Sequence, residues 1–268
     1  MPCTNRIAFV SLALLAACGQ AAAPAPAPAP EPAHIADPIA VPAAVTAALA
    51  DPERAMHVPT DARRHPAELL AFSGVKAGDR VLDLIPGDGY WTRIFSAIVG
   101  PQGRVYAVWP QAYARFAMGN VQDMRKLSAD KYYGNIVTQV QASAVLSAPE
   151  PLDVVWTSQN YHDYPDEYMG KDADPNLLNK AVFKILRPGG TYMIIDHMAK
   201  AGRGMADTEK LHRIDPATVR QQVEAAGFKF AGESKVLNNP ADPMDIPVFD
   251  PKIRGHTSQF AYKFVKPN

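Results

Sequence analysis

The sequence predicts a single α/β domain built on an open, mostly parallel sheet of seven strands, with helices on both faces. Two observations lead to this prediction. From residue 61 to residue 226, short apolar segments alternate with amphipathic ones, which is typical of strands joined by crossover helices. Residues 229–236 and 259–265 then alternate apolar and polar side chains, so we expect a C-terminal antiparallel strand pair.

The first half of the domain should contain three strands and three helices. Residues that disfavour helical backbone follow two of the helices: Gly74 after the first, and Gly100 with Pro101 after the second. The expected strands are residues 80–84, 104–109 and 136–140, and the expected helices are residues 61–72, 91–99 and 112–127.

The second half continues the alternation up to the C-terminal strand pair. Its expected strands are residues 152–157 and 191–195, and its expected helices are residues 177–186 and 216–226. Pro216 lies in the first turn of the last helix, where its missing N–H is tolerated, and Gly227 closes that helix. The Pro- and Asp-rich 238–255 loop is either a lid over the site or a simple excursion.

The N-terminus has the features of an export signal. Residues 1–17 carry one positive charge and a short apolar run that ends in small residues. The sequence Leu-Ala-Ala-Cys ending at Cys18 resembles the lipobox of bacterial lipoproteins, which implies lipidation of Cys18; an ordinary cleaved signal is the alternative. Gly19 is similar to the outer-membrane sorting pattern. We therefore expect an exported protein, lipid-anchored to the cell envelope at the outer membrane and facing the periplasm.

Composition separates a tether from the folded domain. Residues 18–45 consist mostly of alanine and proline and cannot bury a core, so they should form a semi-rigid spacer. Residues 46–268 form the predicted domain and are numerous enough to enclose a sizeable core.

Charge and cysteine usage exclude two kinds of function. The 27 basic and 27 acidic residues balance, whereas a nucleic-acid-binding face normally gives a basic excess, so we expect no nucleic-acid partner. The two cysteines are Cys18 and Cys3, and Cys3 lies in the segment predicted to be removed. The folded domain should therefore contain no disulfide and no thiolate metal site.

A glycine turn is the most informative motif. Residues 81–90 read Val-Leu-Asp-Leu-Ile-Pro-Gly-Asp-Gly-Tyr: an apolar strand that ends in an acid, then a turn and a helix. Gly87 and Gly89 let backbone N–H groups approach a ligand at the helix N-terminus. Ile85 occupies the position of a first glycine, and we expect its branched side chain to narrow this approach and to resist a positive φ angle. A generic tight turn is the alternative.

The element order and three motifs resemble the class I S-adenosylmethionine (SAM)-dependent methyltransferases, whose fold is Rossmann-like. The motifs are the glycine turn at 81–89, Leu-Arg-Pro-Gly-Gly at 186–190 and Gly-Phe at 227–228. Within this class the chain is similar to uncharacterised bacterial predicted methyltransferases. They share Pro-Gly-x-Gly-Tyr, a Tyr-His-Asp after the fourth strand, and segments matching residues 211–215, 239–242 and 249–255. The resemblance covers about residues 50–268.

The resemblance implies SAM as cofactor and a small molecule as substrate. Gly87 and Gly89 would let the chain pass close to SAM, while Asp83 would hold either the turn or the ligand's ammonium group. The implied cofactor contacts are Asp83, Gly87, Asp88, Gly89, Tyr90, Trp109 and Asn160.

Trp109 departs from the family pattern. It ends the second strand, where the family usually carries an acid that binds the ribose hydroxyls. Tryptophan cannot accept those hydrogen bonds, so it either stacks on the adenine or packs in the core. An acid after the third strand is also missing, with Gln141 the nearest polar residue.

Polar side chains gather where the later strands end. Because the carboxyl ends of parallel strands open into one crevice, we expect these side chains to converge there. They are Asn160, His162 and Asp163 after the fourth strand, Asp196 and His197 after the fifth, and His212, Arg213 and Asp215 before the next helix.

Three interpretations of these polar residues remain open. A histidine could act as general base while a methyl group moves from SAM to the substrate. Alternatively, imidazoles and carboxylates could bind a divalent metal such as zinc, iron or manganese. In the third interpretation, Asp215 caps the helix that begins at Pro216 and the histidines make structural hydrogen bonds.

The sequence thus favours a SAM-dependent methyltransferase-like enzyme that acts on an O or N atom of a small molecule. Its catalytic candidates are His162, Asp163, His197, His212 and Asp215. SAM is a cytoplasmic cofactor, so the export signal supports two alternatives. One is a lipoprotein that uses the same crevice without methylation, with a metal held by His162, His197 and His212; the other is a ligand-binding lipoprotein without catalysis.

Overall fold

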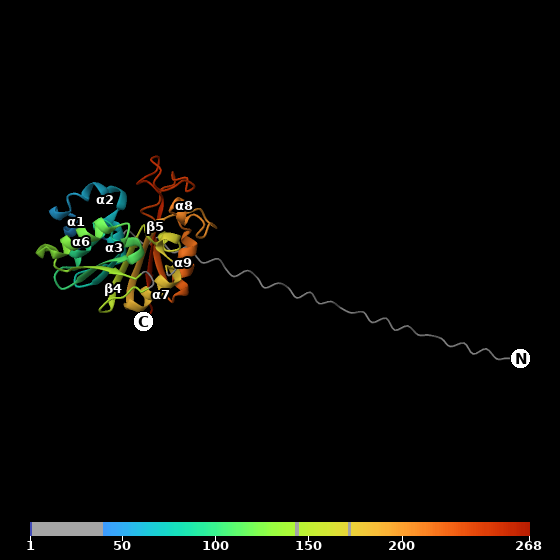
Figure 1. The fold of residues 1–268 in the computed structure, drawn as a ribbon, viewed down its shortest axis with the longest axis horizontal. Coiled ribbons are helices and arrows are strands. Elements are labelled where there is room, and N and C mark those ends of the chain that lie inside the picture. Colours follow the sequence, from blue (N-terminus) through green and yellow to red (C-terminus); the bar gives the residue numbers. More distant parts are fainter. Residues whose placement is uncertain (2–39, 143–144, 171–172) are drawn as a thin grey trace. The chain divides into compact units, whose positions relative to one another are not determined.

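The computed structural model describes Met1 and residues 40–142, 145–170 and 173–268 (Figure 1). The predicted signal, the lipidation site Cys18 and the tether as far as residue 39 lie outside the described residues. Apart from Met1, the described residues belong to one unit that spans Ala36–Asn268.

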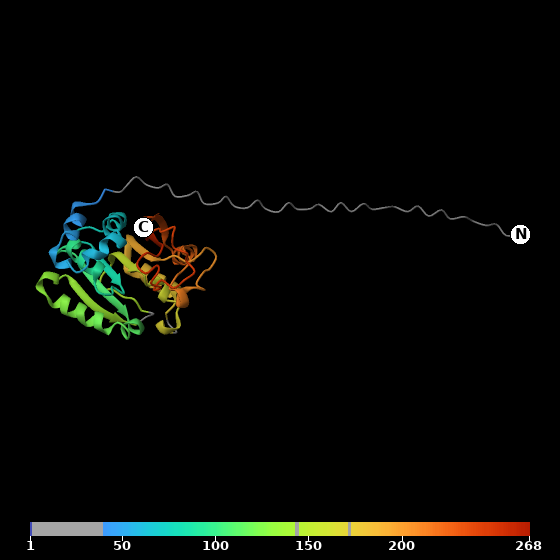
Figure 2. The same ribbon diagram turned by 90° about the horizontal axis from the view of Figure 1, so that it is seen from above.

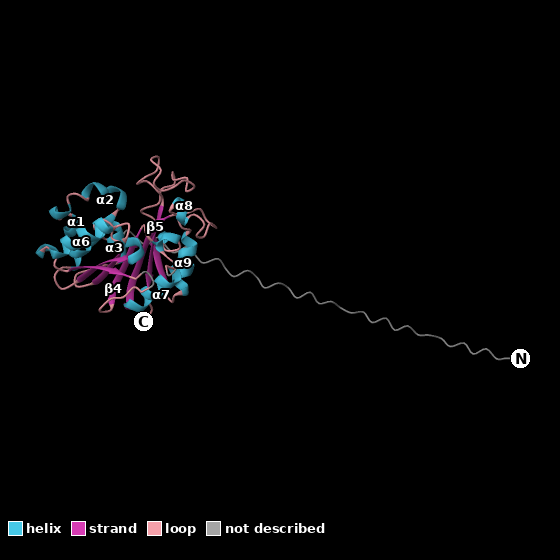
Figure 3. Ribbon diagram, in the orientation of Figure 1, coloured by secondary structure: helices cyan, strands magenta, loops and turns pink. Residues whose placement is uncertain are grey.

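Seven strands of the described chain form one sheet in the order β3-β2-β1-β4-β5-β7-β6. Figure 3 shows the strands of this sheet in magenta and the helices in cyan. The pairs β1–β2, β1–β4, β2–β3 and β4–β5 are parallel, and β7 is antiparallel to both β5 and β6. The predicted fold class is therefore confirmed. The strands are β1 (Arg80–Leu84), β2 (Arg104–Pro110), β3 (Ile136–Gln141), β4 (Leu152–Ser158), β5 (Leu186–His197), β6 (Lys229–Ser234) and β7 (Gln259–Val265).

Helices lie on both sides of this sheet (Figure 2). The α-helices are α1 (Ala43–Leu49), α2 (Val58–Arg64), α3 (Pro66–Ser73), α4 (Tyr90–Val99), α5 (Gln111–Ala114), α6 (Met118–Ala129), α7 (Pro175–Ile185), α8 (Thr208–Leu211) and α9 (Pro216–Ala225). The 3₁₀ turns are η1 (Pro52–Arg54), η2 (Lys131–Tyr133), η3 (Tyr161–Asp163) and η4 (Glu167–Met169). No helix in the described part of the chain combines the length and the apolar character needed to cross a lipid bilayer.

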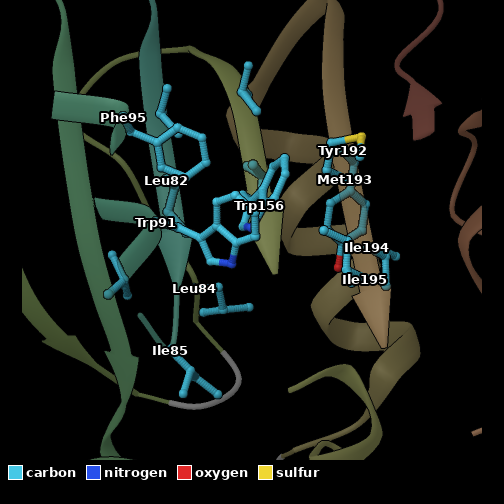
Figure 4. Packing of buried hydrophobic residues seen from close by; sticks show 14 of the residues in the cluster. Leu82, Leu84, Ile85, Trp91, Phe95, Trp156, Tyr192, Met193, Ile194 and Ile195 are labelled. Carbon is cyan, nitrogen blue, oxygen red and sulfur yellow. The ribbon is translucent and has the colours of Figure 1, made fainter. Parts of the chain in front are cut away.

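Aromatic side chains fix α4 against the centre of the sheet. The apolar residues of α4 recur at helical spacing, as in Trp91, Ile94 and Phe95, and are buried. The rings of Trp91 and Phe95 lie 4.7 and 5.2 Å from that of Trp156 on β4 (Figure 4). Burying a large apolar side chain stabilises a fold by about 1.5–3 kcal/mol, so this cluster sets where the N-terminus of α4 lies relative to the strand ends.

Two predicted helices are each split in two. The expected helix 61–72 breaks at His65, whose φ of 45° is left-handed, because the proline that follows disfavours helical backbone there. The expected helix 112–127 breaks after Ala114 and resumes at Met118. This second break shapes the cavity described below.

The folded unit begins earlier than the sequence indicated. Helix α1 starts at Ala43, and Val45 and Ala48 are buried in the core. Residues 43–45, which composition assigned to the tether, therefore belong to a helix of the domain.

Candidate active site

The strand order brings the turn after β1 next to the loop after β4. β1 pairs with β2 on one side and with β4 on the other, so the chain order reverses at this point. In open α/β sheets, ligands bind in the crevice outside the carboxyl ends of the strands at such a reversal. The glycine turn at 85–89 and η3 are the two segments that meet there.

Ile85 adopts a left-handed backbone conformation. From the sequence we had expected its branched side chain to resist a positive φ angle. Its φ is 54°, and such a conformation costs a branched residue about 1–3 kcal/mol. Two hydrogen bonds hold it, because its N–H donates to the Val108 carbonyl at 2.8 Å and its carbonyl accepts from Asn160 Nδ2 at 3.2 Å. The side chain is 4% exposed and lies in the core (Figure 4), so it does not narrow the ligand approach.

Gly87 and Gly89 have different roles although both have positive φ angles, 60° and 85°. A Cβ at Gly87 would meet no described atom within 4 Å, so this side of the turn is open. A Cβ at Gly89 would lie 2.8 Å from the Met124 side chain of α6. Gly87 therefore leaves space for a ligand, whereas Gly89 allows α4 to begin close to α6.

Asp83 holds the turn. Its carboxylate is 1% exposed and accepts a hydrogen bond from Thr92 Oγ1 in the first turn of α4 at 2.6 Å. Burial raises the pKa of Asp83 to about 7, against the smaller opposing effect of Thr92. Of the two roles expected for Asp83, the geometry supports the structural one.

Tyr90 and Asp88, two further predicted cofactor contacts, lie in different environments. Tyr90 is buried and donates to Asp61 Oδ1 at 2.7 Å, while Arg54 donates to both oxygens of Asp61 at 2.6 and 3.0 Å. This network anchors α2 over the glycine turn. Asp88 is exposed to solvent, with His57 Nδ1 at 3.8 Å.

Asn160 ties the end of β4 to the glycine turn. Its Nδ2 donates to the carbonyls of Ser158 at 2.7 Å, Ile85 at 3.2 Å and Leu84 at 3.3 Å. The side chain is 6% exposed. Asn160 therefore positions the turn, and its predicted contact with the cofactor stays a prediction.

An aromatic cavity of about 460 Å³ opens beside Gly87. Its volume lies within the range of small-molecule sites. The centre of the Tyr168 ring of η4 lies 6.4 Å from that of Tyr113 in α5 and 5.8 Å from that of Phe116, which lies between α5 and α6. The lining residues are Gly87, Tyr113, Phe116, Ala117, Asn120 and Tyr168.

Sequence reasoning missed this aromatic wall. Tyr113 and Phe116 are three residues apart, a spacing that within the expected helix 112–127 indicates one packed helical face. Phe116 is instead 74% exposed, because the helix breaks between these two rings. The break itself had no proline or glycine to signal it.

His162 is the centre of a polar cluster that β4 and β5 bring together. Its Nδ1 lies 2.7 Å from Asp196 Oδ1, and its backbone N–H donates to Asp196 Oδ2 at 2.8 Å. Its Nε2 lies 3.1 Å from Asp163 Oδ1 and 3.3 Å from His212 Nδ1. His162, Asp163 and Asp196 are all at most 4% exposed. Of the eight polar residues expected to converge, the structure thus brings His162, Asp163, Asp196 and His212 into direct contact.

Two carboxylates decide the charge of His162. Burial by itself lowers the pKa of this imidazole, but Asp196 and Asp163 outweigh it and raise the pKa to about 10. Without another cation in the cluster, His162 therefore carries a proton on each ring nitrogen at neutral pH. A protonated imidazole cannot accept a proton, so His162 cannot be the general base in that state.

His212 completes the cluster from the C-terminal end of α8. Its backbone is left-handed, with φ 54°, and its side chain is 28% exposed. Burial, and after it the neighbouring His162 cation, lowers the pKa of His212, so this imidazole is neutral at pH 7. The Phe249 ring of the 238–255 loop packs against it at 4.8 Å.

His197 does not bring a ligand atom into the cluster. Its Nδ1 lies 2.8 Å from Thr257 Oγ1, and its ring centre is 6.0 Å from that of His162. Burial lowers the pKa of His197 well below the ordinary value, so it is neutral. The geometry gives His197 a structural role at the junction of β5 and β7.

Asp215 caps α9, as the third interpretation of the sequence proposed. Its carboxylate accepts from the backbone N–H groups of Ala217 at 2.9 Å and Gly202 at 2.7 Å. Both oxygens are therefore committed to the backbone. The assignment of Asp215 as a catalytic candidate needs correction for this reason.

The 238–255 loop is anchored beside the cluster. Arg213 is fully buried and donates to both oxygens of Asp242 at 2.8 and 2.9 Å. Asp242 also accepts from the Ser258 backbone N–H at 2.6 Å. A loop held by a buried ion pair acts as a fixed cover over the edge of the cluster.

Asp163 connects the polar cluster with the aromatic cavity. Burial, and after it the negative charge of Asp163, raises the pKa of Tyr113 to about 12 and raises that of Tyr168 as well. Both tyrosines line the cavity. Asp163 therefore lies close to two side chains of the cavity wall.

The chain is similar in sequence to known proteins over part of its length. No protein-family model matches it. It is 30% identical over 128 residues to the ubiquinone/menaquinone biosynthesis C-methyltransferase UbiE of Saccharophagus degradans, covering 47% of this chain and 46% of the relative. For UbiE of Hahella chejuensis the identity is 32% over 126 residues, covering 46% and 45%. The chain spans about half the length of the curated relatives it matches.

Solved structures resemble the chain over most of its length. A SAM-dependent methyltransferase from Aquifex aeolicus aligns at a TM-score of 0.52 and 17% identity, covering 82% of this chain and 95% of that one. The glycopeptide N-methyltransferase MtfA, complexed with SAM, aligns at 0.51 and 15%, covering 78% and 87%. The chain has the class I SAM-dependent methyltransferase fold.

The class I methyltransferase fold does not fix the reaction by itself. The [4+2]-cyclase SpnF also aligns with this chain, at a TM-score of 0.56 and 14% identity, covering 80% of this chain and 82% of that one. One fold can thus carry different chemistries, and the function must be argued from the site.

Trp109 occupies the position where the class I methyltransferase pattern has its ribose-binding acid. Its side chain is 0% exposed, and its Nε1 has no hydrogen-bond partner among the described residues. Trp109 is also not among the residues that line the cavity. The packing interpretation therefore fits Trp109, and the aromatic surfaces open to a ligand are Tyr113, Phe116 and Tyr168 instead.

Proposed function

We propose that this chain is a SAM-dependent methyltransferase that transfers a methyl group to an O or N atom of a small molecule. The fold and the distant similarity to UbiE support the reaction class. The observation that carries the proposal is the aromatic cavity beside Gly87, whose wall residue Tyr168 lies close to Asp163.

The residues around the cavity fit SAM. The open side of Gly87 leaves room for the ligand to approach the backbone at the start of α4. Tyr113, Phe116 and Tyr168 offer aromatic faces on which an adenine ring can stack. When bound, SAM supplies an electrophilic methyl group.

The polar cluster would serve the methyl acceptor. Asp163 is buried behind the cavity wall, and neutral His212 lies beside it with part of its ring exposed. These two groups can orient an acceptor hydroxyl or amine and accept its proton as the methyl group is transferred. Asp196 holds the His162 ring, which in turn fixes Asp163 and His212.

Replacing Gly87 tests where the cofactor binds. In Gly87→Leu the new side chain would fill the open side of the turn, so we expect the affinity for S-adenosylhomocysteine, measured by calorimetry on the full-length protein, to fall more than tenfold. Gly78→Leu is the matched control, because Gly78 also has a positive φ and open space but lies before β1, at the opposite end of the sheet. Equal affinity in both variants would contradict the proposal.

We also propose that the chain is exported and lipid-anchored through Cys18. The support is the sequence of the N-terminal segment, with its short apolar run and its small residues before the cysteine. In cell fractionation, the unmodified protein should sediment with membranes and Cys18→Ser should appear in the soluble fraction. A variant that stays in the membrane fraction would contradict the anchor.

A further inference from the structure

Three side chains point their ligand atoms at one place beside the cavity. His162 Nε2 lies 3.1 Å from Asp163 Oδ1 and 3.3 Å from His212 Nδ1, and the last two atoms are 4.0 Å apart. The three residues come from η3 and from the end of α8, so the fold, and not one local segment, assembles the set.

These distances match those between ligands of one metal ion. Metal–nitrogen and metal–oxygen bonds are about 2.1 Å long, so two ligand atoms on one ion lie roughly 3.0 Å apart at right angles and roughly 3.4 Å apart at tetrahedral angles. Two of the three distances fall in that range, and a small rotation of the partly exposed His212 ring would shorten the third.

Asp196 holds His162 in the orientation that a metal ligand requires. Its Oδ1 lies 2.7 Å from His162 Nδ1, which leaves Nε2 directed at Asp163 and His212. Histidine ligands of metal ions commonly donate their other ring N–H to a carboxylate in this way, which fixes the tautomer and the ring orientation. Asp196 is itself fixed, because it accepts from the backbone N–H groups of His162 and His197.

We propose that His162, Asp163 and His212 bind a divalent transition-metal ion. Two imidazoles and one carboxylate suit zinc, iron or manganese and leave coordination positions open for a substrate. His197, which the sequence had suggested as a ligand, is not part of the set: the residues whose ligand atoms lie within 4.8 Å of one another are His162, Asp163 and His212. Asp163 takes its place.

The ion would lie near the aromatic cavity, because Asp163 ends η3 and Tyr168 of the next turn, η4, lines the cavity. The ion would bind the oxygen of an acceptor hydroxyl and lower its pKa, so the hydroxyl could lose its proton to solvent while Asp163 and His212 serve as metal ligands instead of proton acceptors. The substrate would then be an oxygen-bearing molecule. This role rests on the proposed methyl transfer. The metal site itself does not, because it is argued from the three side chains and Asp196 alone.

Cobalt(II) titration of the full-length protein, purified without a His tag, tests the site. Calorimetry and the visible absorption of the ion should report one site per chain with nitrogen and oxygen ligands. His212→Gly removes an imidazole while keeping the left-handed backbone, and Asp163→Asn removes a carboxylate at constant size. We expect each variant to bind cobalt(II) more than tenfold more weakly.

His65→Gly is the matched control. His65 is also a left-handed histidine that ends a short helix, but it lies outside the cluster, so its replacement should leave cobalt(II) affinity unchanged. No binding by the unmodified protein, or unchanged binding in either cluster variant, overturns the site. If thermal unfolding shows that one variant does not fold, the other decides. SAM is absent from this titration, so its result is separate from that of the proposed function.

Discussion

The two sides of the crevice use their polar side chains in different ways. On the glycine-turn side, Asp83 and Tyr90 are engaged in hydrogen bonds to Thr92 and Asp61, and the surface left for a ligand is aromatic. On the histidine side, the ligand atoms of the cluster point toward one another. The first side therefore offers a shaped aromatic surface to a ligand, and the second offers polar groups that can react.

We expect the largest difference between the two sides in how much the ion pair that anchors each side contributes to stability. Arg213 and Asp242, behind the histidine cluster, are both fully buried, whereas Asp61 of the Arg54–Asp61 pair is 26% exposed. Breaking a buried pair leaves an uncompensated charge, so Arg213→Met should lower the free energy of unfolding in urea by about 3–5 kcal/mol. Arg54→Met should lower it by about 1–3 kcal/mol, because water can still reach Asp61.

A double variant checks this cause. Arg213→Met combined with Asp242→Leu removes both charges and should recover part of the loss seen in Arg213→Met alone. Equal losses in the two single variants would mean that the two anchors do not differ as described.

On the glycine-turn side, the buried carboxyl group of Asp83 should make the free energy of unfolding depend on pH. Burial raises its pKa to about 7, whereas the unfolded chain ionises near 3.8. Between these values the folded state binds more protons than the unfolded state, so its contribution to stability falls as pH rises from 4 to 7, by up to about 4 kcal/mol. Asp83→Asn, which can still accept from Thr92, should remove this dependence in urea titrations at pH 4 and pH 7; an unchanged dependence would contradict the buried acid.

Ile85 should have the smallest effect on ligand binding. Its side chain lies in the core, so Ile85→Gly should change SAM affinity less than threefold. Stability should still fall by about 2 kcal/mol, since lost burial of about 2–5 kcal/mol exceeds the relief of about 1–3 kcal/mol of backbone strain. Calorimetry and urea unfolding measure the two effects. A gain in affinity above tenfold would show that Ile85 does obstruct the cofactor.

Much of the sheet could be predicted from the sequence because buried parallel strands are short apolar runs. β1, for example, has the predicted bounds Arg80–Leu84, and β7 has the predicted bounds Gln259–Val265. The convergence of His162, Asp163 and His212 followed from the same topology. Both features follow from the order of strands and helices along the chain, which can be derived from the sequence.

The roles of single residues were harder to predict, because they depend on burial and on partners far along the chain. Trp109 is a core residue and Asp215 a helix cap, although both had positions that suggested function. The cavity was missed because Tyr113 and Phe116 became its wall through a helix break without a sequence signal. Packing decided these cases.

Calorimetric titration of SAM into the full-length unmodified protein tests the central claim most directly. We expect saturable binding of about one SAM per chain, with S-adenosylhomocysteine competing for the same site. Absence of heat at millimolar SAM, together with no competition, would contradict a methyltransferase cofactor site beside Gly87.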